Sequence, residues 1–304
     1  MNDMRSVAAA YLQVRRSLGF KMKYDEKLIS QFIDFLEREK AEYITYALAL
    51  RWATMPACHP ARWKNRYGAI RRFAQYVQSL EPKTEVLPKG ALQQRYPRRK
   101  PYIYTDREIL RLVKAAKQSR APKGLWGWTF YTLFSLLAVT GMRVAELVNL
   151  NREDVDLKDG ILIIRESKFR KSRLIPIHTS TSRALARYAR LRDTLFPDLH
   201  SGSFFVTERG KRLTPKRVEA KFLALARKIG LRGPEGIPGP RLHDLRHTFT
   251  VRTLLNWYRS GADVEAHLPE LSTYLGHRGI DETFWYISAV PELLDLAVQR
   301  LEHL

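Results

Sequence analysis

The first eighty residues carry apolar side chains at the spacing of α-helices. Between residues 7 and 18 they recur every three or four positions, and Gly19 then supplies a stop. Further stripes of the same kind occupy residues 28–36, 43–53 and 61–80. Each stripe leaves polar residues on its opposite side, so each helix can bury one face against its neighbours. The pattern predicts a compact, all-helical module over residues 1–82.

A basic stretch rich in proline follows this module and interrupts the helical pattern. Residues 83–101 contain three prolines and the run Arg98-Arg99-Lys100. Proline lacks a backbone N–H and favours extended chain, so a continuous helix is excluded here. We interpret the stretch as a basic linker that crosses a phosphate backbone and joins the module to a second domain, residues 102–304.

The second domain again follows a mainly helical pattern, with one small sheet. Thr105 can cap a helix, because Glu108 stands three residues later and completes a capping box. The apolar run of residues 126–138 predicts a buried helix. Short stretches rich in β-formers point to strands at Val155, residues 161–164 and residues 174–177. The predicted fold class is mainly α with a small antiparallel β-sheet.

The net charge of the chain indicates the class of partner that it binds. The 304 residues carry a net charge of +22, with 53 Lys and Arg against 31 Asp and Glu. Residues 1–100 hold 20 basic and 9 acidic side chains, and residues 101–304 hold 33 and 22. An excess spread over both parts favours a polyanionic partner, with nucleic acid as the first candidate. Basic side chains within residues 61–80 suit a DNA groove or backbone, although a solvated basic face is the other interpretation.

Several other classes of protein are disfavoured by the sequence. Cys58 is the single cysteine, so the chain forms no internal disulfide and offers no cysteine zinc site. The longest apolar region, residues 130–139, is too short to cross a bilayer, and the N-terminus lacks the apolar core of a signal peptide. No phosphate-binding loop and no acidic cluster of the two-metal kind occurs. We expect a cytoplasmic, DNA-associated protein with no membrane partner, no cofactor and no metal.

The candidate chemistry lies between residues 241 and 288. His243 and Arg246 stand three residues apart, so on a helix they share a face. The pair suits a phosphate, because Arg offers a planar fork of donors and His can exchange a proton near neutral pH. His277 follows, and Tyr286 comes nine residues after it. Two imidazoles, a guanidinium and a phenol can therefore meet at one site.

This arrangement resembles the tyrosine recombinase (phage integrase) family. The family's C-terminal pattern is His-x-x-Arg, then Leu-Gly-His, then a nucleophilic tyrosine about nine residues later. An arginine is expected upstream, and here Arg143 stands in the run TGMRVAEL. A lysine is expected in a β-hairpin before a run such as RLVPL, and Lys168 precedes RLIPI. All six family positions are filled in order over about 145 residues.

The resemblance implies a DNA strand-exchange enzyme and a role for each position. Tyr286 would be the nucleophile that forms a 3′-phosphotyrosine, which preserves the phosphoester energy without ATP or metal. Arg143 and Arg246 would clamp the scissile phosphate and stabilise its developing charge. Tyr274 is the nearest rival for the nucleophile, but its spacing is that of a core residue.

The remaining residues are expected to transfer protons or to support the site. The resemblance implies that Lys168 acts as general acid toward the leaving 5′-oxygen. His243 would assist proton transfer, and His277 would hydrogen-bond the phosphate. We interpret His247 and Glu146 as structural residues, the first supporting the site and the second orienting the upstream arginine.

The resemblance also implies an architecture and an assembly. A helical N-terminal DNA-binding domain and a catalytic domain would enclose double-stranded DNA, with a homotetramer on paired recombination sites. Integration, transposition and resolution of a mobile element all fit. Two alternatives remain: a type IB topoisomerase, which relaxes supercoils without exchange, and a non-catalytic DNA-binding regulator, although no nucleophile or arginine is lost here.

The last segment, residues 291–304, begins with a proline suited to a helix start. Its apolar stripe consists of Leu294, Ala297, Val298 and Leu301. The stripe can pack against its own domain. The resemblance favours the alternative, in which the helix docks into a neighbouring protomer and couples the two active sites.

Overall fold

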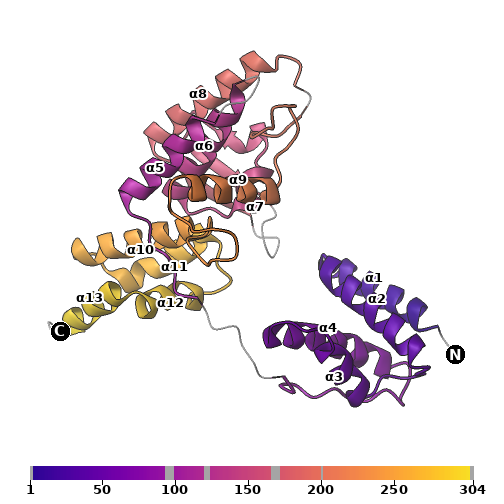
Figure 1. Ribbon diagram of the computed structural model, residues 1–304. Coiled ribbons are helices and arrows are strands. Elements are labelled where there is room, and N and C mark those ends of the chain that lie inside the picture. Colours follow the sequence, from indigo (N-terminus) through magenta and orange to yellow (C-terminus); the bar gives the residue numbers. More distant parts are fainter. Residues whose placement is uncertain (1–2, 93–98, 120–123, 166–171, 200, 302–304) are drawn as a thin grey trace. The chain divides into compact units, whose positions relative to one another are not determined.

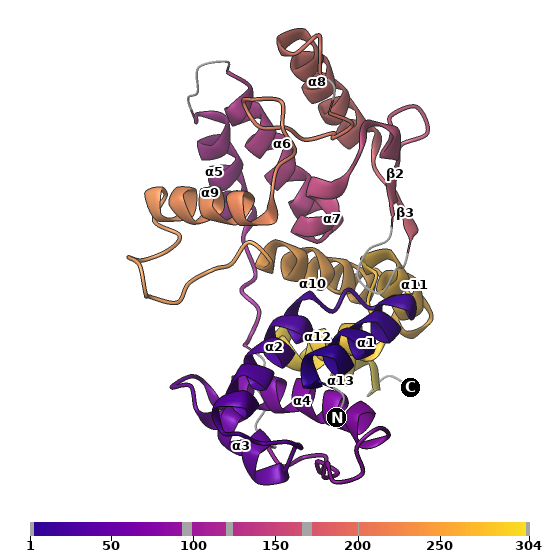
Figure 2. The same cartoon turned by 90° about the vertical axis from the view of Figure 1, so that its right-hand side faces the viewer.

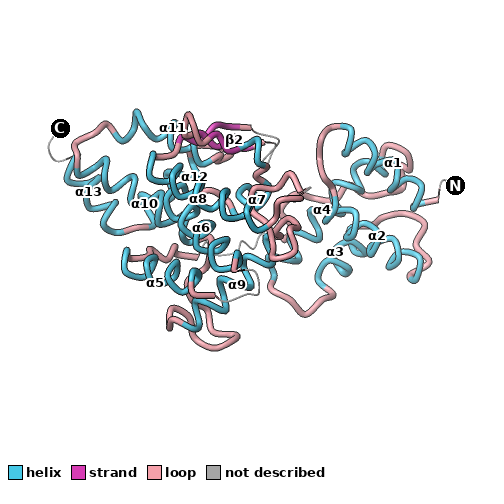
Figure 3. Tube along the Cα trace, turned by 90° about the horizontal axis from the view of Figure 1, so that it is seen from above, coloured by secondary structure: helices cyan, strands magenta, loops and turns pink. Residues whose placement is uncertain are grey.

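The computed structural model describes residues 3–92, 99–119, 124–165, 172–199 and 201–301. The chain forms two compact units, Met1–Arg99 and Lys100–Leu304. Helices make up most of both, and the strands are confined to one small sheet (Figure 3). Among the described residues, no helix combines the length and the apolar character needed to cross a membrane.

The first unit is the helical module that the periodicity predicts (Figure 1). Its helices are α1 (Met4–Ser17), α2 (Lys23–Arg38), α3 (Tyr46–Thr54) and α4 (Pro60–Gln78). Phe32, Ile70 and Phe73 are fully buried in their shared core. Local signals agree with these ends: the Asp3 side chain caps α1, and a proline opens α4.

The basic residues of α4 do not form one free surface. Arg66 lies over the ring of Trp52, 3.6 Å from its centroid, and donates to that residue's carbonyl. Arg72 pairs with an aspartate of α2 at 2.8 Å. These two guanidinium groups stabilise the unit itself. The exposed basic side chains of the helix include Arg62 and Lys64.

The chain after α4 continues to pack on this unit through residues 84–88. The Glu85 amide donates to the carbonyl of Ile44 at 2.9 Å, and the Glu85 carboxylate accepts from the amide of Tyr46 at 2.7 Å. Leu87 is buried in the core. The beginning of the stretch assigned to the linker from its sequence therefore lies within the first compact unit.

The second unit holds the predicted mixture of helices and one small sheet (Figures 1 and 2). Its helices are α5 (Asp106–Lys117), α6 (Leu125–Thr140), α7 (Val144–Asn149), η1 (Arg152–Asp154), α8 (Thr179–Leu195), α9 (Pro215–Lys228), α10 (Asp244–Arg259), α11 (Val264–Leu275), α12 (Asp281–Ala289) and α13 (Pro291–Leu301). The strands β1 (Val155–Asp156), β2 (Ile161–Ile164) and β3 (Arg173–Pro176) pair antiparallel in the order β1-β2-β3. The predicted fold class is confirmed.

Helix α6 forms the centre of this unit. It is apolar nearly all round, and Phe130, Leu133 and Phe134 are fully buried. Helix α5 packs against it and begins with the predicted capping box, since Thr105 and Glu108 exchange hydrogen bonds at 3.2 and 2.8 Å. A second core lies between α10, α11, α12 and α13. The turns that join these elements carry the candidate site.

The last helix, α13, packs inward through a face other than its predicted apolar stripe. Leu293 is fully buried and Leu296 is partly buried, and both belong to the core that α10 shares. Leu294 and Val298, from the predicted stripe, each remain 46% exposed. The inward packing therefore comes from the neighbouring apolar positions, and the predicted stripe faces outward at these two residues.

Candidate active site

Arg246 ties together the three segments that form the site. It lies in the first turn of α10 and is 3% exposed. Its guanidinium donates to the carbonyl of Gly141, at the end of α6, at 3.0 Å. It also donates to the carbonyl of Leu275, at the end of α11, at 2.8 Å. Both helices end on a glycine with positive φ, which turns these carbonyls toward the arginine.

Arg143 is fixed beside this group by a buried carboxylate. It precedes α7 and donates to Glu146 at 2.9 Å and to the carbonyl of Gly276 at 2.7 Å. Arg173 of β3 binds the same carboxylate at 2.8 Å. Burial opposes the ionisation of Glu146, but the hydrogen bonds and charges of the two arginines outweigh it and lower the pKa of the carboxyl. Glu146 therefore binds two arginines, whereas the sequence predicted that it orients Arg143 alone.

Gly276 makes the close approach of these guanidinium groups possible. Its φ is +66°, a conformation that side chains rarely adopt. A Cβ there would lie 2.7 Å from Nη1 of Arg173 and 3.3 Å from Nη1 of Arg143. A side chain at this position would therefore force the guanidinium of Arg173 to shift.

His277 follows that glycine and is 7% exposed. Its Nδ1 shares a hydrogen bond of 2.7 Å with the hydroxyl of Thr283, a fully buried residue of α12. The bond fixes the orientation of the imidazole. Thr283 lies one turn before Tyr286, so one short helix carries both the support of His277 and the candidate nucleophile.

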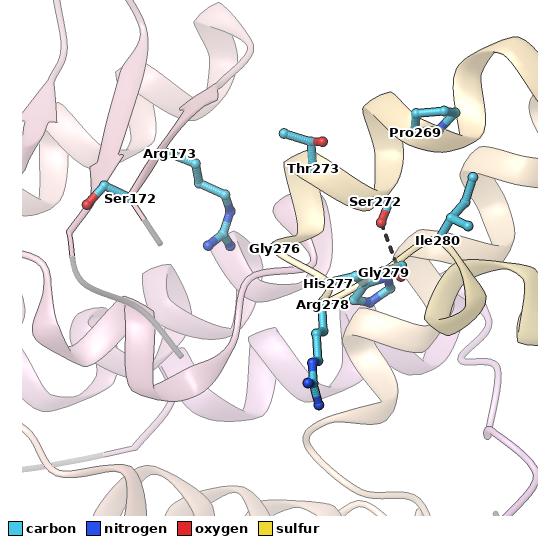
Figure 4. A pocket seen from close by; sticks show the side chains of 10 residues that line it. All are labelled: Ser172, Arg173, Pro269, Ser272, Thr273, Gly276, His277, Arg278, Gly279 and Ile280. Carbon is cyan, nitrogen blue, oxygen red and sulfur yellow. Dashed lines mark hydrogen bonds between the residues drawn. The ribbon is translucent and has the colours of Figure 1, made fainter. Parts of the chain in front are cut away.

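A hollow of about 280 Å³ opens beside His277. Figure 4 shows Arg173 reaching from β3 toward the turn that carries Gly276 and His277. On the other side, the Ser272 hydroxyl donates to the Gly279 carbonyl at 3.4 Å and braces the same turn. The hollow is lined by Ser172, Arg173, Pro269, Ser272, Thr273, Gly276, His277, Arg278, Gly279 and Ile280. Its basic edge suits an anionic backbone.

Tyr286 lies inside the same cluster, on α12. It is 2% exposed, and its hydroxyl is hydrogen-bonded to Nδ1 of His247 at 2.6 Å. The other ring nitrogen of His247, Nε2, lies 3.9 Å from a carboxylate oxygen of Asp244. From its sequence position His247 was interpreted only as a supporting residue, because its partner Tyr286 comes from another helix.

His243, which precedes α10, and His247, in its first turn, are held in the neutral form. The His243 and His247 rings are 4.8 Å apart between centroids. Burial and the charges of Arg246 and Arg241 lower the pKa of His243 to about 4. Burial and the adjacent His243 lower the pKa of His247 to about 4. Each imidazole can therefore accept a proton at neutral pH.

The pKa of Arg246 also shows how concentrated the positive charge is. Burial, followed by the charge of Arg143, lowers it to about 10. The guanidinium stays protonated at neutral pH, but a neighbouring anion would relieve the repulsion. The site is therefore prepared for negative charge.

The sequence predicts six catalytic residues. The structure brings five of them to these connected segments: Arg143, His243, Arg246, His277 and Tyr286. Lys168 lies outside the described residues. The rival Tyr274 stacks on Phe249, with ring centroids 5.7 Å apart, and burial raises its pKa to about 12. In the described part of the chain, no group of three or more His, Cys, Asp or Glu is placed to hold a metal.

Comparisons with known proteins give the class to which this fold and site belong. The model of the phage integrase family matches residues 103–292. The chain is 41% identical over 309 residues to "Putative integrase/recombinase y4rB" of Sinorhizobium fredii, an alignment that covers 99% of this chain and 98% of that protein. It is 27% identical over 227 residues to tyrosine recombinase XerC of Chlamydia caviae, covering 73% and 66%.

A solved structure shares the fold over the full length. The Tn1549 transposon integrase in complex with transposon right end DNA covers 98% of this chain and 99% of its own, with a TM-score of 0.69 and 17% identity. The chain belongs to the phage integrase family: it is a tyrosine recombinase, an enzyme of site-specific DNA recombination.

Proposed function

We propose that this chain cleaves and rejoins double-stranded DNA at a specific site through a 3′-phosphotyrosine on Tyr286. One observation carries the assignment: the Tyr286 phenol, the buried Arg246 and the half-buried Arg143 come together where α10, α12 and the α6–α7 and α11–α12 turns converge. The N-terminal unit is proposed to bind DNA together with the catalytic unit, because the basic excess is present in both.

The proposed chemistry follows from the charges of the site. Arg143 and Arg246 bind the non-bridging oxygens of the scissile phosphate. Their interaction with these oxygens is strongest in the transition state, where negative charge accumulates. Their bonds to backbone carbonyls keep both guanidinium groups in place before the substrate arrives. His277 adds a hydrogen bond to the phosphate, and His243 assists proton transfer. Lys168 protonates the leaving 5′-oxygen.

The assembly is proposed as a homotetramer on two paired sites. Strand exchange needs four strands to be cleaved and religated, one for each active site. The exposed residues Leu294 and Val298 of α13 offer an apolar contact for a neighbouring protomer. The same reaction serves integration, transposition and resolution, so the proposal is the reaction and not one of these tasks.

The nucleophile is tested with a trapped intermediate. Tyr286→Phe protein is first used to select bound duplexes from a random DNA pool, because it binds without cleaving. Versions of the selected duplex, nicked at successive positions, are then incubated with each protein and denatured. Wild type and Tyr274→Phe are expected to form covalent adducts, whereas Tyr286→Phe forms none.

Two results would contradict the proposal. An adduct that persists in Tyr286→Phe would place the nucleophile elsewhere. Relaxation of a supercoiled plasmid that lacks the selected site, at the same rate as a plasmid that contains it, would indicate topoisomerase activity instead of site-specific exchange.

A further inference from the structure

We propose that His247 is the base of the cleavage step and that its Nδ1 accepts the proton of the Tyr286 hydroxyl as the phenolic oxygen attacks phosphorus. The inference rests on the proposed function and adds a catalytic residue to it. The family resemblance assigned proton transfer to His243 and Lys168 and left His247 as a supporting residue.

The first support is the contact between the two side chains. The Tyr286 oxygen and His247 Nδ1 lie 2.6 Å apart, within the range from which a general base takes a proton directly. The tyrosine is 2% exposed and the histidine side chain is 11% exposed. The proton therefore has a direct route to the imidazole, and bulk water is not required as a relay.

The second support is the group behind the imidazole. When Nδ1 accepts the phenolic proton, Nε2 carries the other ring proton, and this nitrogen faces Asp244 at 3.9 Å. Asp244 is buried and is held by the amide and the guanidinium of Arg241 at 2.7 and 2.6 Å. The negative charge of its carboxylate favours the imidazolium that forms, at a distance longer than a hydrogen bond.

The charges around His247 set its state before the reaction. The titratable groups that face it are His243, Asp244, Arg241, Arg246 and Tyr286. Burial and the positive neighbours keep the ring neutral, with its pKa lowered to about 4. An incoming phosphate brings negative charge, which favours the imidazolium. The base thus becomes stronger when DNA occupies the site.

The neighbouring His243 has different contacts from those of His247. Its ring packs edge-on against that of His247 at 4.8 Å, and it feels the charges of Arg246, Arg241 and Arg143. The hydrogen bond to the tyrosine hydroxyl is made by His247. His243 is therefore placed toward the arginines, and His247 toward the nucleophile.

The Tyr286 O–H bond breaks and its proton goes to His247 Nδ1, while an O–P bond forms. The bond from phosphorus to the 5′-oxygen breaks, and that oxygen takes a proton from the general acid. The products are a 3′-phosphotyrosine, a 5′-hydroxyl, a protonated His247 and a general acid that has lost one proton. In rejoining, His247 returns the proton to the departing phenolic oxygen.

The test combines His247→Gln with a more acidic phenol. Single-turnover cleavage of the selected nicked duplex is measured by adduct formation, with Tyr286 replaced by a fluorinated tyrosine in parallel. His247→Gln is expected to slow cleavage by about 10²–10⁴-fold, the usual contribution of a general base, with little change in DNA binding. The fluorinated tyrosine loses its proton without help. It is therefore expected to raise the cleavage rate of the variant by at least about tenfold and that of wild type only slightly.

Matched controls separate this role from the others. His267→Gln, at an exposed histidine of α11, is expected to cleave like wild type. A substrate with a 5′-bridging sulfur, which leaves without a proton, is expected not to rescue His247→Gln. His247→Asn is measured as well, so that a folding defect of one variant, seen by circular dichroism, does not decide the result.

Three outcomes would overturn the inference. The first is cleavage by both folded His247 variants at the wild-type rate. The second is slow cleavage that the fluorinated tyrosine does not restore, which would make His247 a positioning residue only. The third is a wild-type protein without a Tyr286-dependent adduct, which would overturn the proposed function and this inference together.

Discussion

Each of the two site arginines is anchored by other groups of the protein. Within the described part of the chain, Arg246 binds two backbone carbonyls, and Arg143 binds one carbonyl and Glu146. A guanidinium carries five N–H donors, so both retain donors for phosphate oxygens. The anchors hold each fork in position, so little reorganisation is needed when charge develops.

The first prediction concerns these arginines. Arg143→Ala and Arg246→Ala should each slow cleavage by about 10²–10³-fold, because a preorganised donor to the transition state is lost. DNA binding should weaken much less, since many other cations contact the backbone. Adduct formation and gel-shift affinity on the same duplex measure the two effects.

Arg183→Ala, at an exposed position of α8, serves as the control and should change neither quantity strongly. Equal losses of binding and cleavage in the two site variants would mean that these arginines are ordinary backbone contacts.

Contacts between different elements could not be predicted from the sequence. Spacing along one helix was enough to pair His243 with Arg246. The contact of His247 with Tyr286 joins two helices, and the contact of Glu146 with Arg173 joins a helix and a strand. No local spacing contains such pairs, because they arise from tertiary packing. They turned two residues interpreted as structural into parts of the site.

At the element scale, the turns around the site matter more than the helices they join. The second prediction uses Gly276→Ala. The added methyl group meets the guanidinium of Arg173, in a backbone conformation that already disfavours a side chain. We expect a loss of about 1 kcal/mol or more in unfolding free energy, together with a marked loss of cleavage, because the collision displaces the arginines.

Gly230→Ala is a matched control, because Gly230 has a similar φ of +71° and no heavy atom within 4 Å of the added Cβ. It should show the loss of stability alone. Urea unfolding and adduct formation give the two readouts, and equal cleavage by both variants would show that the collision does not reach the site.

The elements themselves were largely predictable. The stripes in the first unit, the capping box of α5 and the three strands carry strong local signals, and each lies where its sequence indicated. The packing of α13 remained open in the sequence, because Leu293 and Leu294 are adjacent. Apolar residues occupy both sides of that helix, so periodicity could not decide which side packs inward.

At the scale of the whole molecule, the buried histidines make stability depend on pH. His243 and His247 have pKa values of about 4 in the folded chain, against an ordinary value of 6.5. Between these values the unfolded chain binds more protons, so stability rises with pH across this window and is lost as pH falls from 6.5 toward 4. The lowered pKa of Glu146 acts in the same direction at still lower pH.

The third prediction follows from this linkage. Urea unfolding of the full chain, followed between pH 7.5 and 4.5, should show a loss of a few kcal/mol toward acid. His247→Gln should reduce the slope, because one proton-linked group is removed. A slope unchanged by this variant would mean that His247 does not titrate differently in the folded and unfolded chains.

The fourth prediction concerns assembly and rests on the proposed tetramer. Deleting α13 would expose the core around Leu293, so the outward residues are the better target. The double change Leu294→Glu and Val298→Glu should leave folding and binding to one site intact but prevent two sites from being held together. Native gels with one and two sites measure this.

Leu293→Ala provides the contrast, since an emptied core position costs about 2–5 kcal/mol of stability. If the double variant still holds paired sites as well as wild type, the exposed face of α13 is not the contact between protomers.

The depth of Tyr286 has a consequence for the genome as well as for the chemistry. A DNA break held on this side chain would remain joined to a residue that is 2% exposed. Stray hydrolysis of the phosphotyrosyl bond would leave a permanent lesion, and it requires a water molecule in line with that bond. Because the packed helices α10 and α12 limit access to bulk water, the returning 5′-hydroxyl meets little competition. Burial of the proposed nucleophile would thus favour fidelity, because strands that are opened would be closed again.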